Sequence, residues 1–296
     1  MKLEGGLYTV IPTFFKESEV DIDQLIRAVE IQVNCGVKNV VLLGTTSETP
    51  TLSVEEQEKI VKNVWEKFHN MINIIVGIGG NNTKQTLEFG FKFENFCDAF
   101  MITVPYYNKP NQEGIYQHFS TIANLISKPI LLYNIPSRCG VSIEPTTIAK
   151  LFNDHENIQA IKEASGNINQ ILEIRKMCDI IILSGDDALT LPTMSVGGEG
   201  VVSVASNLLP KQMLLLINLF KSNKLSEAIE LNDKLYPIFK CLFIDTNPVP
   251  LKFLLNKVNL AENCNVRLPL VSLNSIEKIN LLNEIVKKIN FVTEAI

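Results

Sequence analysis

The sequence contains no uncharged apolar run of 18 residues, which is about the length that a membrane-spanning helix needs. The N-terminal residues 1–12 show neither a long apolar core nor a small-residue cleavage site, so we expect no secretory signal. Lys and Arg form no dense run and the net charge is −5, which gives nucleic-acid binding no electrostatic support. We therefore expect a cytoplasmic protein that binds neither a membrane nor nucleic acid.

Cysteine and histidine are scarce and scattered. The six cysteines stand singly at positions 35, 97, 139, 178, 241 and 264, without a Cys-x-x-Cys pair. This spacing argues against a metal knuckle, a redox motif or a disulfide scaffold and favours reduced thiols. The three histidines, His69, His118 and His155, fall on expected helices or helix ends, where a surface position is the usual one. No Gly-x-Ser-x-Gly elbow accompanies them, so a serine hydrolase has no support.

Nucleotide and metal motifs are also missing. There is no phosphate-binding Gly-x-x-x-x-Gly-Lys loop, and the stretch Gly77–Asn82 lacks the last glycine of a dinucleotide fingerprint. The pair Asp186-Asp187 has no His or Glu at ligand spacing, so we interpret it as a turn rather than a metal site. We expect neither a cofactor nor a metal.

Eight short apolar runs rich in β-branched residues alternate with segments of helical period. The expected strands are Leu7–Thr13, Asn39–Leu43, Ile74–Ile78, Ala99–Val104, Ile130–Asn134, Ile158–Glu163, Ile180–Ser184 and Gly200–Val204. Their almost continuous apolar character is typical of parallel strands covered on both faces. Eight strand–helix pairs without a linker-like stretch predict an α/β fold of the (β/α)8 TIM-barrel type, a barrel that occupies residues 1–223.

The helical pattern continues beyond the expected barrel. Between the strands, the amphipathic segments are Asp21–Asn34, Ser53–Phe68, Thr83–Phe96, Gln112–Leu125, Glu144–Phe152 and Pro210–Ser222. Ser53 stands three residues before Glu56, which is the spacing of a capping box. Residues 224–296 carry three further helical segments, Leu225–Phe243, Val249–Val258 and Ile276–Val292. We expect them to form a C-terminal helical extension.

Lys162 is an unusual residue for the end of an apolar strand. Ile158, Ala160 and Lys162 share one face of the expected strand, which stops at Ser165-Gly166. A lysine held there loses hydration of its ammonium group, which favours the neutral, nucleophilic amine. A lysine that reaches out to solvent from the strand end is the alternative reading of this stretch alone.

Polar residues follow the ends of the other expected strands. They include Gly44–Glu48, Gly79–Asn82, Pro105–Asn108, Tyr133–Arg138, Ser184–Asp187 and Ser203. Since the strands of such a barrel end at one rim, we expect these residues to converge there with Lys162. A lysine that forms an imine with a keto acid needs proton donors and acceptors, which hydroxyls provide, and anion-binding groups for carboxylates.

Four motifs stand in the order and at the spacing of a known family. They are Gly44-Thr45-Thr46-x-Glu48, Tyr106-Tyr107-Asn108, Tyr133-Asn134-Ile135-Pro136-x-Arg138-x-Gly140 and Ile161–Gly166. From about Gly5 to Pro250 the chain resembles the dihydrodipicolinate synthase / N-acetylneuraminate lyase family of pyruvate-dependent class I aldolase-type enzymes. Ser47, where the family usually has glycine, and Cys139, where it commonly has threonine, depart from the pattern.

The resemblance implies a role for each motif. Lys162 would be the Schiff-base lysine, and the proton relay would consist of Tyr133, Thr45 and Tyr107, the last supplied across a subunit interface of a homotetramer built as a dimer of dimers. The residues assigned to substrate binding are Thr46, Arg138, Gly185 and Val202. Arg138 points to the synthase branch, whose lyase reaction condenses pyruvate with aspartate 4-semialdehyde on the route to diaminopimelate and lysine.

Two alternatives remain beside this assignment. Another pyruvate-dependent lyase, acting on N-acetylneuraminate, 4-hydroxy-2-oxoglutarate or a sugar acid, would use the same imine lysine. A barrel that keeps the fold and only binds or regulates is the second, although the lysine and all relay residues are present. The resemblance also bears on feedback by lysine, because Val54, Gln57 and Gln85 stand where lysine-inhibited members carry histidines and an acid. We therefore expect weak inhibition by lysine.

Overall fold

The computed structural model describes residues 2–294, and side chains as far as residue 289. Its eight long strands are parallel and form a closed barrel in the order β1-β10-β9-β8-β7-β6-β5-β4, which confirms the predicted fold. They are β1 Leu7–Val10, β4 Asn39–Leu42, β5 Asn73–Gly77, β6 Ala99–Thr103, β7 Ile130–Asn134, β8 Ile158–Glu163, β9 Ile181–Ser184 and β10 Gly200–Ser203. Each lies within a few residues of its predicted run.

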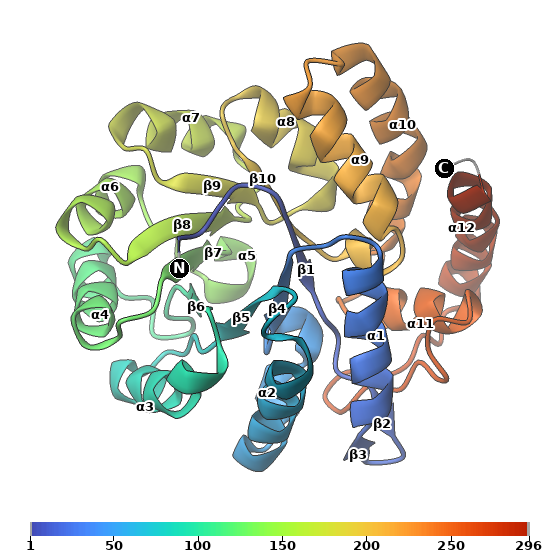
Figure 1. Cartoon of the computed structure of the whole chain (residues 1–296), viewed down its shortest axis with the longest axis horizontal. Helices are drawn as coiled ribbons and strands as arrows, with labels where there is room; N and C mark the ends of the chain where they lie inside the picture. Colours follow the sequence, from blue (N-terminus) through green and yellow to red (C-terminus); the bar gives the residue numbers. More distant parts are fainter. Residues whose placement is uncertain (1, 295–296) are drawn as a thin grey trace. The chain divides into compact units, whose positions relative to one another are not determined.

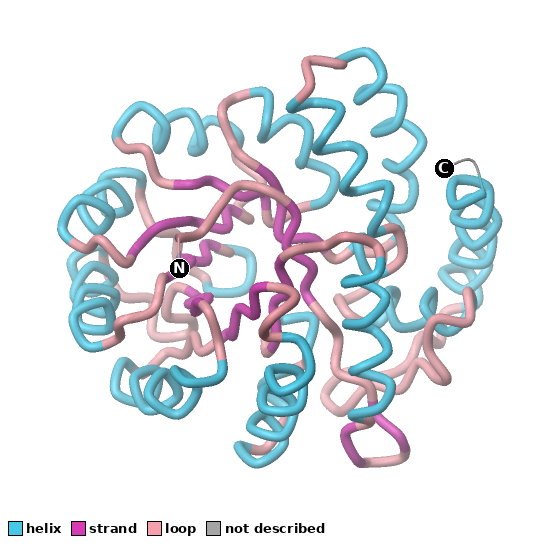
Figure 2. Tube along the Cα trace, viewed as in Figure 1, coloured by secondary structure: helices cyan, strands magenta, loops and turns pink. Residues whose placement is uncertain are grey.

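Two compact units divide the chain, and the first comprises Met1–Gly6 and Asn73–Val202. Its strands β5–β9 lie inside its helices, as the magenta and cyan parts of the trace show (Figure 2). Its longer helices are α3 Thr83–Phe93, α4 Gln112–Leu125, α6 Pro145–Asp154 and α7 Ile168–Met177 (Figure 1). In the ladder between β7 and β8, Tyr133 is paired with Lys162 and Asn134 with Glu163. Because side chains alternate along a strand, each pair lies on its own face of the sheet.

The second unit comprises Leu7–Ile72 and Ser203–Ile296. Its helices are α1 Ile22–Asn34, α2 Val54–Phe68, α9 Pro210–Lys221, α10 Leu225–Cys241, α11 Val249–Lys257 and α12 Ile276–Glu294. The capping box at the start of α2 is present, since Ser53 and Glu56 each accept from the other's backbone N–H. The boundary at residue 223 falls inside this unit, between α9 and α10, and the division into barrel and extension stays a prediction.

Some short elements were not predicted. The hairpin of β2 Phe15–Lys16 and β3 Glu19–Val20 has strands of two residues, too short for a periodic pattern. Helices α5 Pro136–Cys139 and α8 Thr190–Ser195 are only four and six residues long. Helix α7 was not predicted either.

The surface expectation for His118 is wrong. Its side chain on α4 is only 5% exposed, and its Nδ1 lies 2.9 Å from the hydroxyl of Thr83 at the start of α3. Burial lowers the pKa of His118 to about 4, because a charged imidazole would lose its hydration. The pair Asp186-Asp187 forms a turn, as predicted, in which the Asp186 carboxylate accepts a hydrogen bond from the Ala188 N–H at 2.9 Å.

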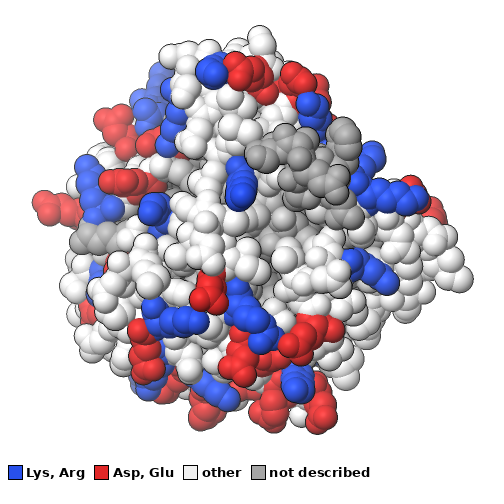
Figure 3. Space-filling model, turned by 45° about the vertical axis from the view of Figure 1, so that its right-hand side comes forward, with Lys and Arg blue, Asp and Glu red and all other residues white. Residues whose placement is uncertain are grey.

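On the face of the molecule drawn in Figure 3, acidic and basic side chains are interspersed around the edge. None of the helices within residues 2–294 is long and apolar enough to cross a membrane. Within the same residues, no group of three or more His, Cys, Asp or Glu side chains is arranged to hold a metal ion.

Candidate active site

Lys162 is buried at the end of β8, with only 5% of its surface exposed. Its Nζ lies 4.2 Å from the centroid of the Tyr133 ring, the residue paired with it on β7. Apart from this ring contact, the amine has no polar partner: it makes no hydrogen bond or ion pair with any of the described residues. A buried amine with no acceptor beside it keeps its lone pair available for a carbonyl carbon.

Gly185, just beyond β9, packs closely against Ala164 and the stem of Lys162. A Cβ added at Gly185 would lie 2.4 Å from the Ala164 Cβ and 3.1 Å from the Lys162 Cε. Any side chain there would force the lysine stem or the Ala164 backbone to move. The absence of a side chain at Gly185 therefore lets its backbone approach Lys162 closely. Val202, another predicted pocket residue, is buried on β10.

The next residue, Glu163, lies on the opposite face of β8 and is held entirely by neutral donors. Asn134 and Gln170 donate to its Oε2 at 2.9 and 3.0 Å, and the Ser165 N–H donates to its Oε1 at 2.7 Å. Burial raises the pKa of Glu163 above its ordinary value, although these donors partly offset the loss of hydration. The network ties β7, β8 and α7 together directly behind Tyr133 and Lys162.

Two exposed residues of the first unit, Arg138 and Tyr107, carry functional groups. Arg138 lies on the one-turn helix α5, and within the described part of the chain its guanidinium has no hydrogen-bond or ion-pair partner. Tyr107 is 88% exposed and has a φ of 70°, a strained left-handed conformation for a tyrosine. Its N–H donates to the Cys139 carbonyl at 3.4 Å. The Cys139 thiol itself is buried and donates to the Val104 carbonyl, and burial raises its pKa to about 11.

The Thr45–Thr46 turn belongs to the second unit. Thr45–Ser47 form a turn of 3-10 helix after β4, in which Thr46 is buried and Thr45 is half-buried. Ser47, which replaces the usual glycine, donates its hydroxyl to the Ile11 carbonyl at 2.7 Å. The Ser47 side chain is therefore hydrogen-bonded to the residue that follows β1. The Thr46 Oγ1 accepts a hydrogen bond from the Asn247 Nδ2 at 3.0 Å.

Sequence reasoning missed the residues that support these groups. Glu163 and Asn134 stood inside recognised motifs, but the pattern gave them no function. Lys252 carried a signal that was not used, because it is the one charged residue in the apolar run Val249–Leu255. It is buried and paired with Glu48. Asn247 carried no such signal, since its partner Thr46 is 201 positions away.

Each of the two units holds its own set of functional groups. The first holds an unpaired, buried amine beside a phenol ring, together with an exposed guanidinium that can form two parallel hydrogen bonds with a carboxylate. The second holds two threonine hydroxyls in a tight turn.

The sequence and the fold are both similar to those of known proteins. A family model described as the dihydrodipicolinate synthetase family matches residues 2–289. A curated protein of Methanococcus maripaludis, named 4-hydroxy-tetrahydrodipicolinate synthase, is 43% identical over 279 residues, which cover 94% of this chain and 96% of that protein. The crystal structure of a dihydrodipicolinate synthase from Thermotoga maritima is 38% identical, with a TM-score of 0.94 over 97% of this chain and 99% of that one. A structure from Cyanidioschyzon merolae, described as having lysine bound, is 33% identical, with a TM-score of 0.94 over 98% and 99%.

Proposed function

The chain belongs to the dihydrodipicolinate synthetase family, and we propose that it condenses pyruvate with aspartate 4-semialdehyde, the 4-hydroxy-tetrahydrodipicolinate synthase reaction. The observation that carries the proposal is the buried Lys162 amine, which has Tyr133 beside it and no ion-pair partner among the described residues. A relative that is 43% identical over most of both chains is named for this reaction.

In the proposed reaction, the Lys162 nitrogen adds to the ketone carbon of pyruvate, and water is lost to form an imine. Loss of a proton from the methyl carbon gives an enamine. Its carbon attacks the aldehyde carbon of the semialdehyde, whose oxygen gains a proton and becomes a hydroxyl. The amine of the semialdehyde then adds to the former ketone carbon and displaces Lys162, which closes the ring and restores the enzyme.

Each remaining residue has a proposed role. Thr45, Tyr133 and Tyr107 would carry protons for loss of water and formation of the enamine. Thr46 would donate to the pyruvate carboxylate, and Gly185 and Val202 would shape the pocket. Arg138 would bind the semialdehyde carboxylate, which its unpaired guanidinium supports.

The proposed assembly is a homotetramer built as a dimer of dimers, located in the cytoplasm. Its support within this chain is Tyr107. A phenol that is 88% exposed is a poor proton relay, because water surrounds it and competes for its hydrogen bonds. In the proposed dimer, Tyr107 would complete the relay of the partner subunit and become buried there.

Trapping the imine tests the proposal. Borohydride added with pyruvate should leave one reduced pyruvate adduct, and mass spectrometry should place it on the peptide that contains Lys162. Aspartate semialdehyde should then be consumed in an assay coupled to a reductase that uses the product. An adduct on another lysine, or cleavage of N-acetylneuraminate in place of semialdehyde use, would contradict the proposal.

A further inference from the structure

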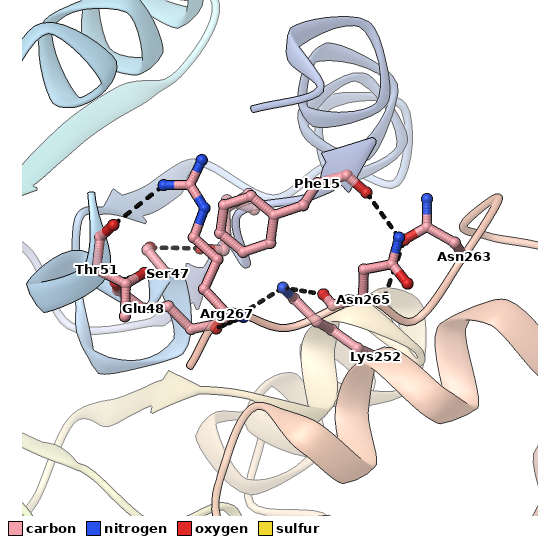
Figure 4. A network of polar contacts seen from close by, with 9 residues as sticks. Phe15, Ser47, Glu48, Thr51, Lys252, Asn263, Asn265 and Arg267 are labelled. Atoms are coloured by element: carbon pink, nitrogen blue, oxygen red, sulfur yellow. Dashed lines mark hydrogen bonds and ion pairs between the residues drawn. The ribbon is translucent and has the colours of Figure 1, made fainter. Parts of the chain in front are cut away.

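Three side chains of the C-terminal segment hold the turn that carries Thr45 and Thr46. We call Asn247, Lys252 and Arg267 the C-terminal clamp. They contact the turn Gly44–Thr51 at Thr46, Glu48 and Thr51, and all of these residues belong to the second unit. Figure 4 shows Lys252 and Arg267 reaching Glu48 and Thr51 from the C-terminal segment.

Glu48 is the residue of the turn that most needs support. Its backbone has a φ of 54° and a ψ of 34°, a left-handed conformation that costs free energy for any residue with a side chain. Its carboxylate accepts two hydrogen bonds, one on each oxygen. The Lys252 amine donates at 2.5 Å and the backbone N–H of Arg267 at 2.9 Å. The side chains of Glu48 and Lys252 are each only 1% exposed. The strained turn is thus anchored by a dry ion pair.

The cationic side of the clamp is itself held in place. Lys252 also donates to the Asn265 carbonyl at 2.8 Å and lies 4.4 Å from the centroid of the Phe15 ring. The Arg267 guanidinium lies 4.4 Å from the same ring and donates to the Thr51 carbonyl at 3.0 Å. The guanidinium also donates to the Glu56 carboxylate at 2.5 and 2.7 Å and to the Ser18 carbonyl. Lys252 and Arg267 therefore hold the turn at Glu48 and at Thr51.

Asn247 determines what the Thr46 hydroxyl can do. A hydroxyl has one proton to donate and two lone pairs to accept with. Because the Asn247 Nδ2 donates to the Thr46 Oγ1, the threonine proton is not used for Asn247. Within residues 2–294 that proton has no acceptor, although Thr46 is only 2% exposed. The Asn247 Oδ1 is also buried and without a partner among the described residues.

We propose that Asn247 is a specificity-determining positioning residue, which orients Thr46 as a hydrogen-bond donor to the carboxylate of the keto acid. The inference rests on the proposed function and deepens it. The clamp keeps the turn in place, and the direction of the Asn247–Thr46 hydrogen bond selects an anion over a neutral carbonyl group. A substrate without this carboxylate, such as pyruvamide, gains less from a donor hydroxyl.

Replacing Asn247 by Asp and by Ala separates orientation from simple support. In Asn247→Asp the side chain accepts only, so the Thr46 proton turns toward it and away from the substrate. The pyruvate concentration for half-maximal borohydride trapping should rise about 10- to 100-fold. In Asn247→Ala the proton stays free, and the rise should be only about threefold. A purely structural residue would show the reverse order, because Asp preserves the shape of Asn.

The added charge of Asp is controlled by a second set of variants. In the Thr46→Val background, Asn247→Asp should add less than about twofold if the effect passes through the hydroxyl. Direct repulsion of pyruvate would persist in that background and would overturn the inference. Asn256→Asp is the matched control on α11, since its amide donates to the Ala261 and Glu262 carbonyls. It should lower the melting temperature and leave pyruvate trapping unchanged.

Trapping in the unaltered protein distinguishes the two proposals. If pyruvate leaves no adduct on Lys162, the proposed function fails. If Lys162 is labelled but Asn247→Ala weakens pyruvate use as much as Asn247→Asp, only the role of Asn247 is overturned. Pyruvamide should show a smaller difference between the two variants than pyruvate does.

Discussion

Lys162 and Lys252 are both almost fully buried, at 5% and 1% exposure, yet their surroundings differ in kind. Lys252 has a carboxylate, a carbonyl and an aromatic ring around its amine. Burial lowers its pKa to about 8, even though the adjacent Glu48 acts to raise it. Lys162 has one aromatic ring and, within the described chain, no acceptor. Burial alone therefore does not make a nucleophile, because the Lys252 amine must first break its ion pair and hydrogen bond before it can attack a carbonyl carbon.

The neighbouring glutamates show the same contrast. Glu48 is 3% exposed and is neutralised by Lys252, whereas Glu163 is 4% exposed and receives only neutral donors. A buried pair is costly to break, because the remaining charge is stranded in a dry site. Loss of one neutral donor leaves the other hydrogen bonds in place. We therefore expect the contacts of Lys252 to contribute most to stability and those of Lys162 to reactivity.

The largest expected effect is on catalysis. Lys162→Ala should reduce turnover on the order of 10³-fold or more, because no imine can form. Its melting temperature should stay close to that of the unaltered protein, since no ion pair is broken. Steady-state turnover and borohydride labelling measure the first effect, and thermal unfolding measures the second. Labelling of the Lys252 peptide in this variant would show that the two amines are not as different as their contacts imply.

Lys252→Met should have the opposite profile. Removing the amine strands Glu48 without its cation, and we expect the free energy of unfolding to fall by about 3–5 kcal/mol. Urea titration measures the loss, and pyruvate should still label Lys162 in the folded fraction. Adding Glu48→Gln should recover part of the stability, because it removes the stranded charge. A Lys252→Met variant as stable as the unaltered protein would mean that the pair contributes nothing.

The pH dependence of stability provides a finer test of Lys252. Its pKa is lowered from the ordinary 10.5 to about 8 in the folded protein. Between these values the unfolded chain binds more protons, so the free energy of unfolding should rise with pH. Below about pH 8 both states are protonated and the contribution is constant. The difference between the unaltered protein and Lys252→Met, measured by urea titration from pH 7 to 10, should change by up to about 3 kcal/mol. A difference in the free energy of unfolding that stays constant from pH 7 to 10 would contradict the lowered pKa of Lys252.

Much of this comparison was accessible from the sequence, but only for Lys162. The apolar run before it predicted a strand, and alternation placed the lysine on an inward face. Lys252 lies in an equally apolar run, yet its partner Glu48 is 204 positions away, and nothing local indicates the pairing. The strand register that pairs Tyr133 with Lys162 is likewise a tertiary property. Local patterns determine elements and their faces, whereas long-range hydrogen bonds depend on how the elements pack.

Arg138 extends the comparison to an exposed cation. Because its guanidinium is unpaired among the described residues, Arg138→Ala should break no internal bond and leave the melting temperature unchanged. Loss of a charge-assisted hydrogen bond worth about 1.5–3 kcal/mol should raise the KM for aspartate semialdehyde about 10- to 100-fold. Imine formation with pyruvate should be retained. Equal losses of both activities would indicate a structural role.

The smallest expected effect concerns inhibition by free L-lysine, whose ammonium group is a cation. The resemblance assigns lysine binding to positions occupied here by Val54, Gln57 and Gln85, none of which is charged. The Gln57 amide is already used, because it donates to the Leu52 carbonyl at 3.2 Å. A neutral acceptor in place of a carboxylate weakens a hydrogen bond to an ammonium by roughly tenfold in affinity. Half-inhibition by L-lysine should therefore require millimolar concentrations in the coupled assay, and Gln85→Glu should lower that concentration. Strong inhibition of the unaltered protein far below a millimolar would mean that these uncharged positions do not limit the binding of lysine.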